Sequence, residues 1–191
     1  MRHRPGLDKA AVVRAAAELV NAEGPDALAL GRLAERLDIQ TPSLYNHIDG
    51  LPGLQRDLAV LGTHELGERL ATAAIGKSGL QALAATAQAY REYVKENPGV
   101  YQYSVRSAAN VQPVDPDLQA AQERVIQISL AVVGSFGLQG EEALHALRGL
   151  RSLVHGFATL ETAGGFGLPL DCDESFRRLI EMFGRELEGL H

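Results

Sequence analysis

The chain has 191 residues, with 18 Lys and Arg against 24 Asp and Glu, a formal net charge of −6, and one cysteine, Cys172. A single cysteine excludes an internal disulfide and a cysteine-based metal cluster within one chain, and no apolar run approaches the roughly 20 residues that span a bilayer. Because residues 1–5 also lack the apolar stretch of a signal peptide, we expect a cytoplasmic protein.

The charge is unevenly distributed along the chain. Residues 1–48 hold six basic and six acidic residues, so the whole net charge of −6 lies in residues 49–191. Within the first 14 residues, four basic residues stand against one acidic residue, Asp8. A basic arm on an acidic protein suits a DNA-binding end joined to a domain with another task, but a solvated N-terminus gives the same pattern.

Apolar residues recur at helical spacing in nearly every segment, without period-two alternation between turn signals. The fold is therefore predicted to be all-α, with about nine helices. Gly24 and Pro25 are expected to stop the first helix, and Asp115 with Pro116 to begin the seventh. The predicted helices cover about residues 8–23, 30–37, 41–48, 51–74, 78–96, 100–107, 115–137, 141–162 and 173–188.

Two short helices are predicted to meet at a tight turn within residues 29–48. The turn is expected at 38–40, Thr41 is expected to cap the second helix, and Leu44 and Ile48 are expected to face the core. Packed on the first helix, this pair makes a three-helix head whose last helix can enter a major groove, although the spacing alone also fits a hairpin within a bundle. The side chains expected to face DNA are Thr41, Ser43, Tyr45, Asn46 and His47.

The stretch from Ala27 to Ile48, ALALGRLAERLDIQTPSLYNHI, resembles the DNA-binding signature of TetR-family repressors. The resemblance covers about residues 6–66, and a weaker one covers 150–183. It implies a homodimeric transcriptional regulator, a repressor, whose paired recognition helices bind a palindromic operator and which a small effector releases. It also implies a helix-turn-helix domain at 1–50, linked through the helix at 51–74 to a ligand-binding and dimerisation domain at 51–191. No cofactor is implied.

This sequence departs from the family pattern at two positions. Asp38 stands in the turn where Gly is usual, and Leu51 stands at the start of the fourth helix where a basic residue is common. The N-terminal arm is therefore expected to bear more of the phosphate binding. Its candidate residues are Arg2, Arg4 and Lys9.

Two apolar stripes on the last two helices are the candidate dimer interface, because two such helices from each subunit can form a four-helix bundle. The alternative is that the stripes seal the core of a single chain. The candidate interface residues are Leu147, Leu150, Val154 and Phe157 on one helix, and Phe176, Leu179, Ile180, Phe183 and Leu187 on the other.

The resemblance places an effector pocket between the head and the dimer interface, in about residues 60–160. Tyrosines there offer apolar faces with a hydroxyl tip, which suits a small, mostly hydrophobic molecule with one or two polar groups. The same tyrosines also fit as packing residues, and His155 fits equally in an interface. The candidate ligand contacts are His64, Tyr90, Tyr93, Tyr101, Tyr103, Arg148 and His155.

Two other classes of function compete with a regulator. A small enzyme is disfavoured because the segment beginning His64-Glu65 has Glu68 where a zinc-protease helix needs its second His, so we expect no metal site and no catalytic residues. A helical adaptor without DNA binding is disfavoured by the polar residues 45–47.

Overall fold

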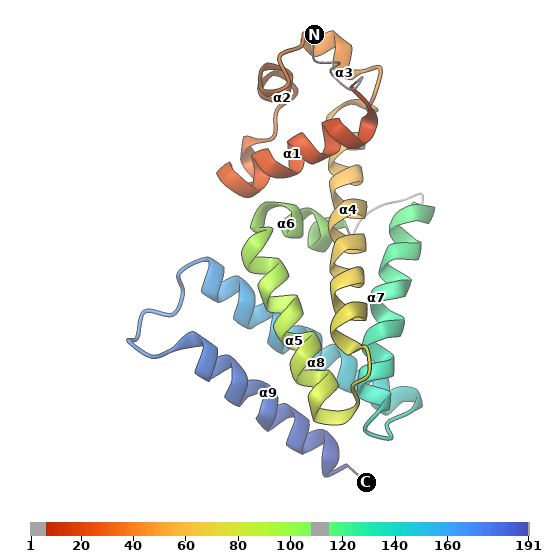
Figure 1. Cartoon of the computed structure of the whole chain (residues 1–191), viewed down its shortest axis with the longest axis vertical. Helices are drawn as coiled ribbons and strands as arrows, with labels where there is room; N and C mark the ends of the chain where they lie inside the picture. Colours follow the sequence, from red (N-terminus) through yellow and green to blue (C-terminus); the bar gives the residue numbers. More distant parts are fainter. Residues whose placement is uncertain (1–6, 108–114, 191) are drawn as a thin grey trace. The chain divides into compact units, whose positions relative to one another are not determined.

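A computed structural model describes residues 7–107 and 115–190 (Figure 1). Those residues form nine α-helices and one short 3₁₀ helix and contain no strand, which confirms the predicted all-helical fold. The elements are α1 (Lys9–Glu23), η1 (Pro25–Ala27), α2 (Leu30–Arg36), α3 (Thr41–Leu44), α4 (Gly50–Ala74), α5 (Gly79–Glu96), α6 (Pro98–Ser107), α7 (Pro116–Gly134), α8 (Gly140–Thr162) and α9 (Cys172–Glu188).

The chain divides into two compact units, and α4 contributes residues to both. The first unit comprises residues 1–63 and 97–118, and the second comprises residues 64–96 and 119–191. This division follows packing. The functional division at residue 50 concerns DNA and ligand binding, and it stays a prediction.

Helix α1 organises the first unit. The Asp8 carboxylate accepts a hydrogen bond from the backbone N–H of Ala11 at 2.7 Å, which caps the helix, and Gly24, at φ +87°, ends it as predicted. One face of α1 is buried against the helices that follow. The fully buried side chains of this core include Val12, Ala16, Val20, Leu33, Leu44, Leu54 and Leu58.

Helix α6 packs against α1 at very short range (Figure 1). The Asn21 side-chain oxygen accepts hydrogen bonds from the backbone N–H groups of Gly99 and Val100 at 3.1 and 3.0 Å. A Cβ atom at Gly99 would lie 2.0 Å from the Val20 carbonyl oxygen. Only glycine fits there, because such a contact is far inside van der Waals distance.

Helices α5, α8 and α9 pack together in the second unit, and the end of α7 contributes to the same core (Figure 1). Leu83 of α5 and Val133 of α7 are fully buried, and Gly184 of α9 lies close to Leu80. Helix α7 ends at Gly134, three residues before the predicted end at Gly137, which itself has φ +86°. The left-handed Gly137 therefore ends the turn that follows α7, and it lies outside the helix.

The Gly99 contact generates a stability prediction. We expect Gly99→Ala to lower the free energy of unfolding by about 3 kcal/mol, because the new methyl group overlaps backbone that cannot move independently. Gly134→Ala is the matched control, since a Cβ there has nothing within 4 Å, and it is expected to leave stability unchanged or raise it by up to about 1 kcal/mol. Urea denaturation followed by circular dichroism measures both, and equal stabilities of the two variants would contradict the prediction.

Candidate DNA-binding site

The turn between α2 and α3 is closed by backbone hydrogen bonds. Asp38 has φ +55°, the only positive value at a described non-glycine residue, and the Ile39 N–H donates to the Ala34 carbonyl at 3.0 Å. This hydrogen bond spans six residues and gives a partner to the Ala34 carbonyl, which has no partner within the helix. Asp is among the residues that tolerate a left-handed backbone, so the turn forms without the usual glycine.

Helix α3 is shorter than expected. It begins at Thr41 and ends at Leu44, and the N-cap position is held by Gln40 without a side-chain hydrogen bond. The predictions that Thr41 caps this helix and that it continues to Ile48 are therefore wrong. The backbone N–H groups of Tyr45, Asn46 and His47 bond three residues back, as in a tighter turn, and the Ile48 N–H bonds to the Leu44 carbonyl.

The polar and apolar sides of this segment are separated. Leu44 and Ile48 are buried, at 0% and 4% exposure, which confirms that they face the core. Tyr45 is 61% exposed, Asn46 is exposed, and His47 is half-buried. Thr41 and Ser43 are also half-buried, so the five side chains predicted to contact DNA all retain access to solvent.

Intramolecular ion pairs compensate most of the positive charge around this segment. Residues 7–63 contain five basic and eight acidic residues. Arg36 pairs with Glu18 at 3.0 Å, and Arg32 pairs with Glu23. Lys9, a predicted phosphate contact, pairs with Asp57 at 2.9 Å. Arg2 and Arg4 lie outside the described residues.

The residues predicted to contact an effector are divided between the two units. Tyr90 and Tyr93 belong to the second unit, whereas Tyr101 and Tyr103 belong to the first. The Tyr103 hydroxyl donates to the Pro25 carbonyl at 2.8 Å, and the Tyr93 hydroxyl donates to Glu65 Oε2 at 3.1 Å.

Burial supports a packing role for two of these tyrosines. Tyr93 is fully buried and Tyr103 is 7% exposed, and burial raises the pKa of both phenols. Both hydroxyls have protein partners, so each side chain is satisfied without a ligand. Of the other candidates, Tyr101 is buried, Tyr90 and His155 are half-buried, and His64 and Arg148 are exposed. Burial also lowers the pKa of His155.

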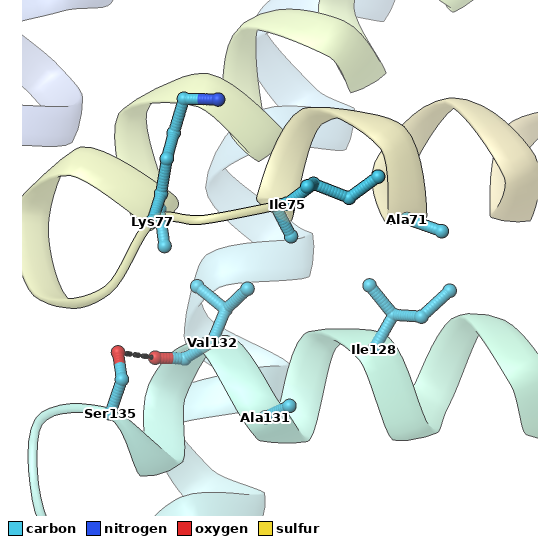
Figure 2. A pocket seen from close by; sticks show the side chains of 9 residues that line it. Ala71, Ile75, Lys77, Ile128, Ala131, Val132 and Ser135 are labelled. Carbon is cyan, nitrogen blue, oxygen red and sulfur yellow. Dashed lines mark hydrogen bonds between the residues drawn. The ribbon is translucent and has the colours of Figure 1, made fainter.

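An apolar depression of about 340 Å³ lies in the second unit, between the end of α4, the start of α5 and the end of α7 (Figure 2). The Lys77 ammonium donates to the Ala73 carbonyl at 2.9 Å, and the Ser135 hydroxyl donates to the Val132 carbonyl at 2.6 Å. None of the seven predicted ligand contacts lines it. Its lining residues are Ala71, Ala74, Ile75, Lys77, Ala82, Ile128, Ala131, Val132 and Ser135.

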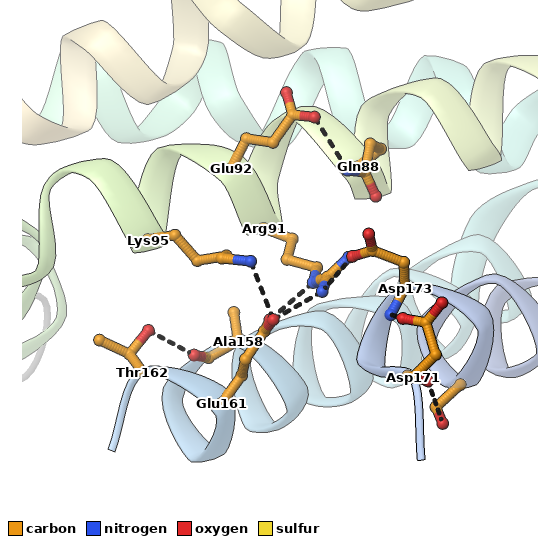
Figure 3. Close-up of polar contacts among 10 residues, drawn as sticks. Gln88, Arg91, Glu92, Lys95, Ala158, Glu161, Thr162, Asp171 and Asp173 are labelled. Atoms are coloured by element: carbon orange, nitrogen blue, oxygen red, sulfur yellow. Dashed lines mark hydrogen bonds and ion pairs between the residues drawn. The ribbon is translucent and has the colours of Figure 1, made fainter. Parts of the chain in front are cut away.

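A buried arginine of the second unit was not predicted from the sequence. Arg91 of α5 is 1% exposed, and its guanidinium forms two hydrogen bonds of 2.6 Å with the Glu161 carboxylate of α8 (Figure 3). It also pairs with Asp173 of α9 at 2.7 Å and lies over the rings of Phe157 and Phe176, 5.5 and 5.0 Å from their centroids. One side chain thus joins three helices.

The nine predicted interface residues divide by burial. Five of them belong to the second unit's own core, which favours the alternative that the stripes seal a single chain: Leu150, Val154, Phe176, Ile180 and Leu187. Leu147, Phe157, Leu179 and Phe183 are half-buried. Other apolar side chains on the same two helices are more exposed, with Leu144 at 47% and Met182 at 57%.

Two further properties bear on the class of protein. Within the described ranges, no helix is both long and apolar enough to cross a membrane. The described His, Cys, Asp and Glu side chains form no group of three that could hold a metal ion. A three-helix head with an exposed polar recognition segment, followed by a helical domain, defines a helix-turn-helix DNA-binding regulator.

Comparisons with known proteins assign the family. Residues 83–183 match the family model described as the tetracyclin repressor-like C-terminal domain. The whole chain is 34% identical to 96% of YobS from Bacillus subtilis strain 168, described as an uncharacterized HTH-type transcriptional regulator. The chain belongs to the TetR family of transcriptional regulators, whose members bind operator DNA and act as dimers with small-molecule effectors.

Solved structures share the fold. A protein of unknown function from Rhodococcus sp. RHA1 superposes with a TM-score of 0.85 at 19% identity, covering 98% of this chain and 99% of that one. A TetR variant from Acinetobacter baumannii AYE in complex with minocycline gives a TM-score of 0.70 at 24% identity, covering 96% and 98%.

The Arg91 cluster generates a pH-dependent prediction. Hydrogen bonds from Arg91, and then from Lys95, lower the pKa of Glu161. A carboxylate with a depressed folded-state pKa contributes stability above its unfolded pKa, about 4.3 for Glu, and loses that contribution as pH falls through the folded value. We expect Arg91→Met to lower the free energy of unfolding by about 3 kcal/mol at neutral pH, because it leaves a carboxylate without its main partner.

The loss caused by Arg91→Met is expected to shrink as pH falls below about 4.3, because the wild-type contribution disappears there. Arg177→Met is the matched control, since Arg177 pairs with Glu174 and Glu181 on an exposed face of α9 and its loss is expected to change stability far less than the loss of Arg91. Denaturant titrations at several pH values make the comparison. A deficit of Arg91→Met that stays constant with pH would contradict the prediction.

Proposed function

We propose that this TetR-family regulator is a cytoplasmic repressor that acts by binding rather than by catalysis. Two recognition segments of a homodimer contact successive major grooves of a palindromic operator, and a small effector ends that binding. The observation that carries the proposal is the separation of sides in residues 41–48, where Leu44 and Ile48 are fixed in the core while Tyr45 is 61% exposed. Burial of one side determines which side chains remain for DNA.

The chemistry of the exposed side fits a duplex. Tyr45 offers a hydroxyl and an aromatic face, Asn46 an amide with donors and an acceptor, and His47 an imidazole. Thr41 and Ser43 add hydroxyl groups suited to phosphate or base edges. The arm residues Arg2 and Arg4 supply phosphate contacts in this proposal, because three of the described cations in the head, Lys9, Arg32 and Arg36, have carboxylate partners.

The recognition side generates the next prediction. Selection from random duplex DNA yields the bound sequence, and on that duplex Tyr45→Ala and His47→Ala are each expected to weaken binding about 10-fold to 100-fold, because each removes one base-edge or phosphate contact. Leu168→Ala is the matched control, since Leu168 is 76% exposed in the second unit and should leave affinity unchanged. Fluorescence anisotropy measures affinity, and circular dichroism checks helical content. Unchanged affinity in both head variants would refute the recognition role.

Dimerisation in this proposal uses the sides of α8 and α9 that the second unit leaves uncovered. Leu144 and Met182 are exposed, and Leu147, Leu179 and Phe183 are half-buried beside them. These side chains lie on α8 and α9 next to the buried residues of the predicted stripes, on the sides that remain accessible to solvent. The buried members of the stripes then support the interface from beneath.

The interface proposal generates a further prediction. Leu179→Asp and Met182→Asp are each expected to yield monomers, because the carboxylate is buried without a partner when the subunits associate. Ile126→Asp is the matched control, since Ile126 of α7 is 41% exposed and lies outside the proposed interface. Analytical ultracentrifugation gives the mass of each variant. A dimer for both α9 variants, or a monomer for Ile126→Asp, would place the interface elsewhere.

The proposed effector is small and mostly hydrophobic. Support comes from the apolar depression at the end of α4, whose lining is mostly Ala, Ile and Val. Contacts with His64, Tyr90, Tyr93, Tyr101, Tyr103, Arg148 and His155 remain part of the proposal. The effector must bind more tightly to the arrangement that cannot span the operator, since equal affinity for both arrangements shifts nothing.

A further inference from the structure

Lys9 lies in the first turn of α1, and its ammonium group contacts the Asp57 carboxylate of α4 at 2.9 Å. The Lys9 side chain is 52% exposed, whereas that of Asp57 is 9% exposed. The cation therefore remains open to solvent on one side, while its carboxylate partner is enclosed by protein.

A second cation, Arg56, contacts the same carboxylate oxygen of Asp57 as Lys9 does. Arg56 Nη1 donates to Asp57 Oδ1 at 2.8 Å, and the same guanidinium donates to Asp115 and, at 3.0 Å, to Asp117, both at the start of α7. Hydrogen bonding from Arg56 lowers the pKa of Asp115, so that carboxylate stays charged and keeps Arg56 in position. Asp57 is thus a carboxylate of fixed place and direction.

We propose that Asp57 is an internal counter-ion that competes with DNA phosphate for Lys9 and thereby sets the DNA affinity of the head. The inference rests on the proposed DNA-binding function and concerns how strongly the head binds. Asp57 touches no DNA in this account. It is a positioning residue that acts through Lys9.

The physical argument compares the two partners of Lys9. Asp57 is already ordered by Arg56 and lies at an enclosed site, where screening by salt is weaker than at the surface. A phosphate must be brought to Lys9, and breaking the internal pair leaves Asp57 with one cation fewer. Lys9 therefore contributes little to DNA binding while it is paired with Asp57.

The net negative charge of residues 7–63 makes the Lys9–Asp57 pair important for DNA affinity. Residues 7–63 carry three more acidic than basic residues, so few cations are available for the backbone of a duplex. Releasing Lys9 from its ion pair therefore adds substantially to the cations that can bind DNA phosphates. The expected effect is on affinity for any duplex, because phosphate contacts carry no sequence information.

The test measures binding of the full-length protein to a fluorescent duplex of random sequence, over salt from about 50 to about 200 mM. Asp57→Asn is expected to raise affinity several-fold at low salt and to steepen the slope of log affinity against log salt by about 0.9 for each protomer bound. Lys9→Gln in the Asp57→Asn background should abolish both gains. Glu92→Gln is the matched control, because it removes one negative charge from an exposed residue of the second unit.

Each outcome decides the proposal. A gain in Asp57→Asn that needs Lys9 and exceeds the effect of Glu92→Gln supports it. An unchanged or weaker affinity with helical content intact overturns it, since Asp57 then does not restrain Lys9. A gain that survives Lys9→Gln also overturns it, because the effect is then one of general charge.

A second variant decides the question if Asp57→Asn does not fold. In the otherwise unchanged chain, Lys9→Gln is expected to leave the salt slope as it was, because the lysine charge is already compensated. A slope reduced by about 0.9 per protomer would show that Lys9 binds phosphate freely and would overturn the proposal. Failure of the wild-type protein to bind any duplex, including selected sequences, would instead refute the DNA-binding function itself.

Discussion

The burial of Leu33 and Leu44 in the core that they share with α1 is the constraint on which the DNA-binding head depends. Helix α2 has seven residues and α3 has four, and helices of that length are unstable alone in water. Both leucines are fully buried, and each such burial contributes about 1.5–3 kcal/mol. The recognition segment therefore exists only as part of a packed core, which also fixes the direction of its polar side chains.

Periodicity predicted most of the fold because apolar spacing is a property of each segment by itself. The ends of α3 were harder to predict, since Gln40 holds the extended N-cap position that was predicted for Thr41. Arg91 escaped prediction for a different reason. A single arginine among apolar residues is usually interpreted as a surface residue. The partner of Arg91, Glu161, is 70 residues away in the sequence.

The stripes of α8 and α9 show why a sequence leaves an interface open. Apolar residues at helical spacing identify a buried face, but they do not say which chain buries it. Val154 and Ile180 are buried by their own unit. Met182, only two residues after Ile180 on α9, is 57% exposed. Similarly, tyrosines in a candidate pocket look alike in sequence, although Tyr93 and Tyr103 already have hydroxyl partners within the protein.

Arg91 binds a residue on each side of the connection between α8 and α9. Glu161 precedes that connection and Asp173 follows it, so one guanidinium fixes both of its ends. The entropy cost of closing a loop grows only slowly with its length, by about 0.6 kcal/mol for each doubling. With both ends fixed on α5, the connection is a place where members of a protein lineage can gain or lose residues while the helix pair keeps its packing.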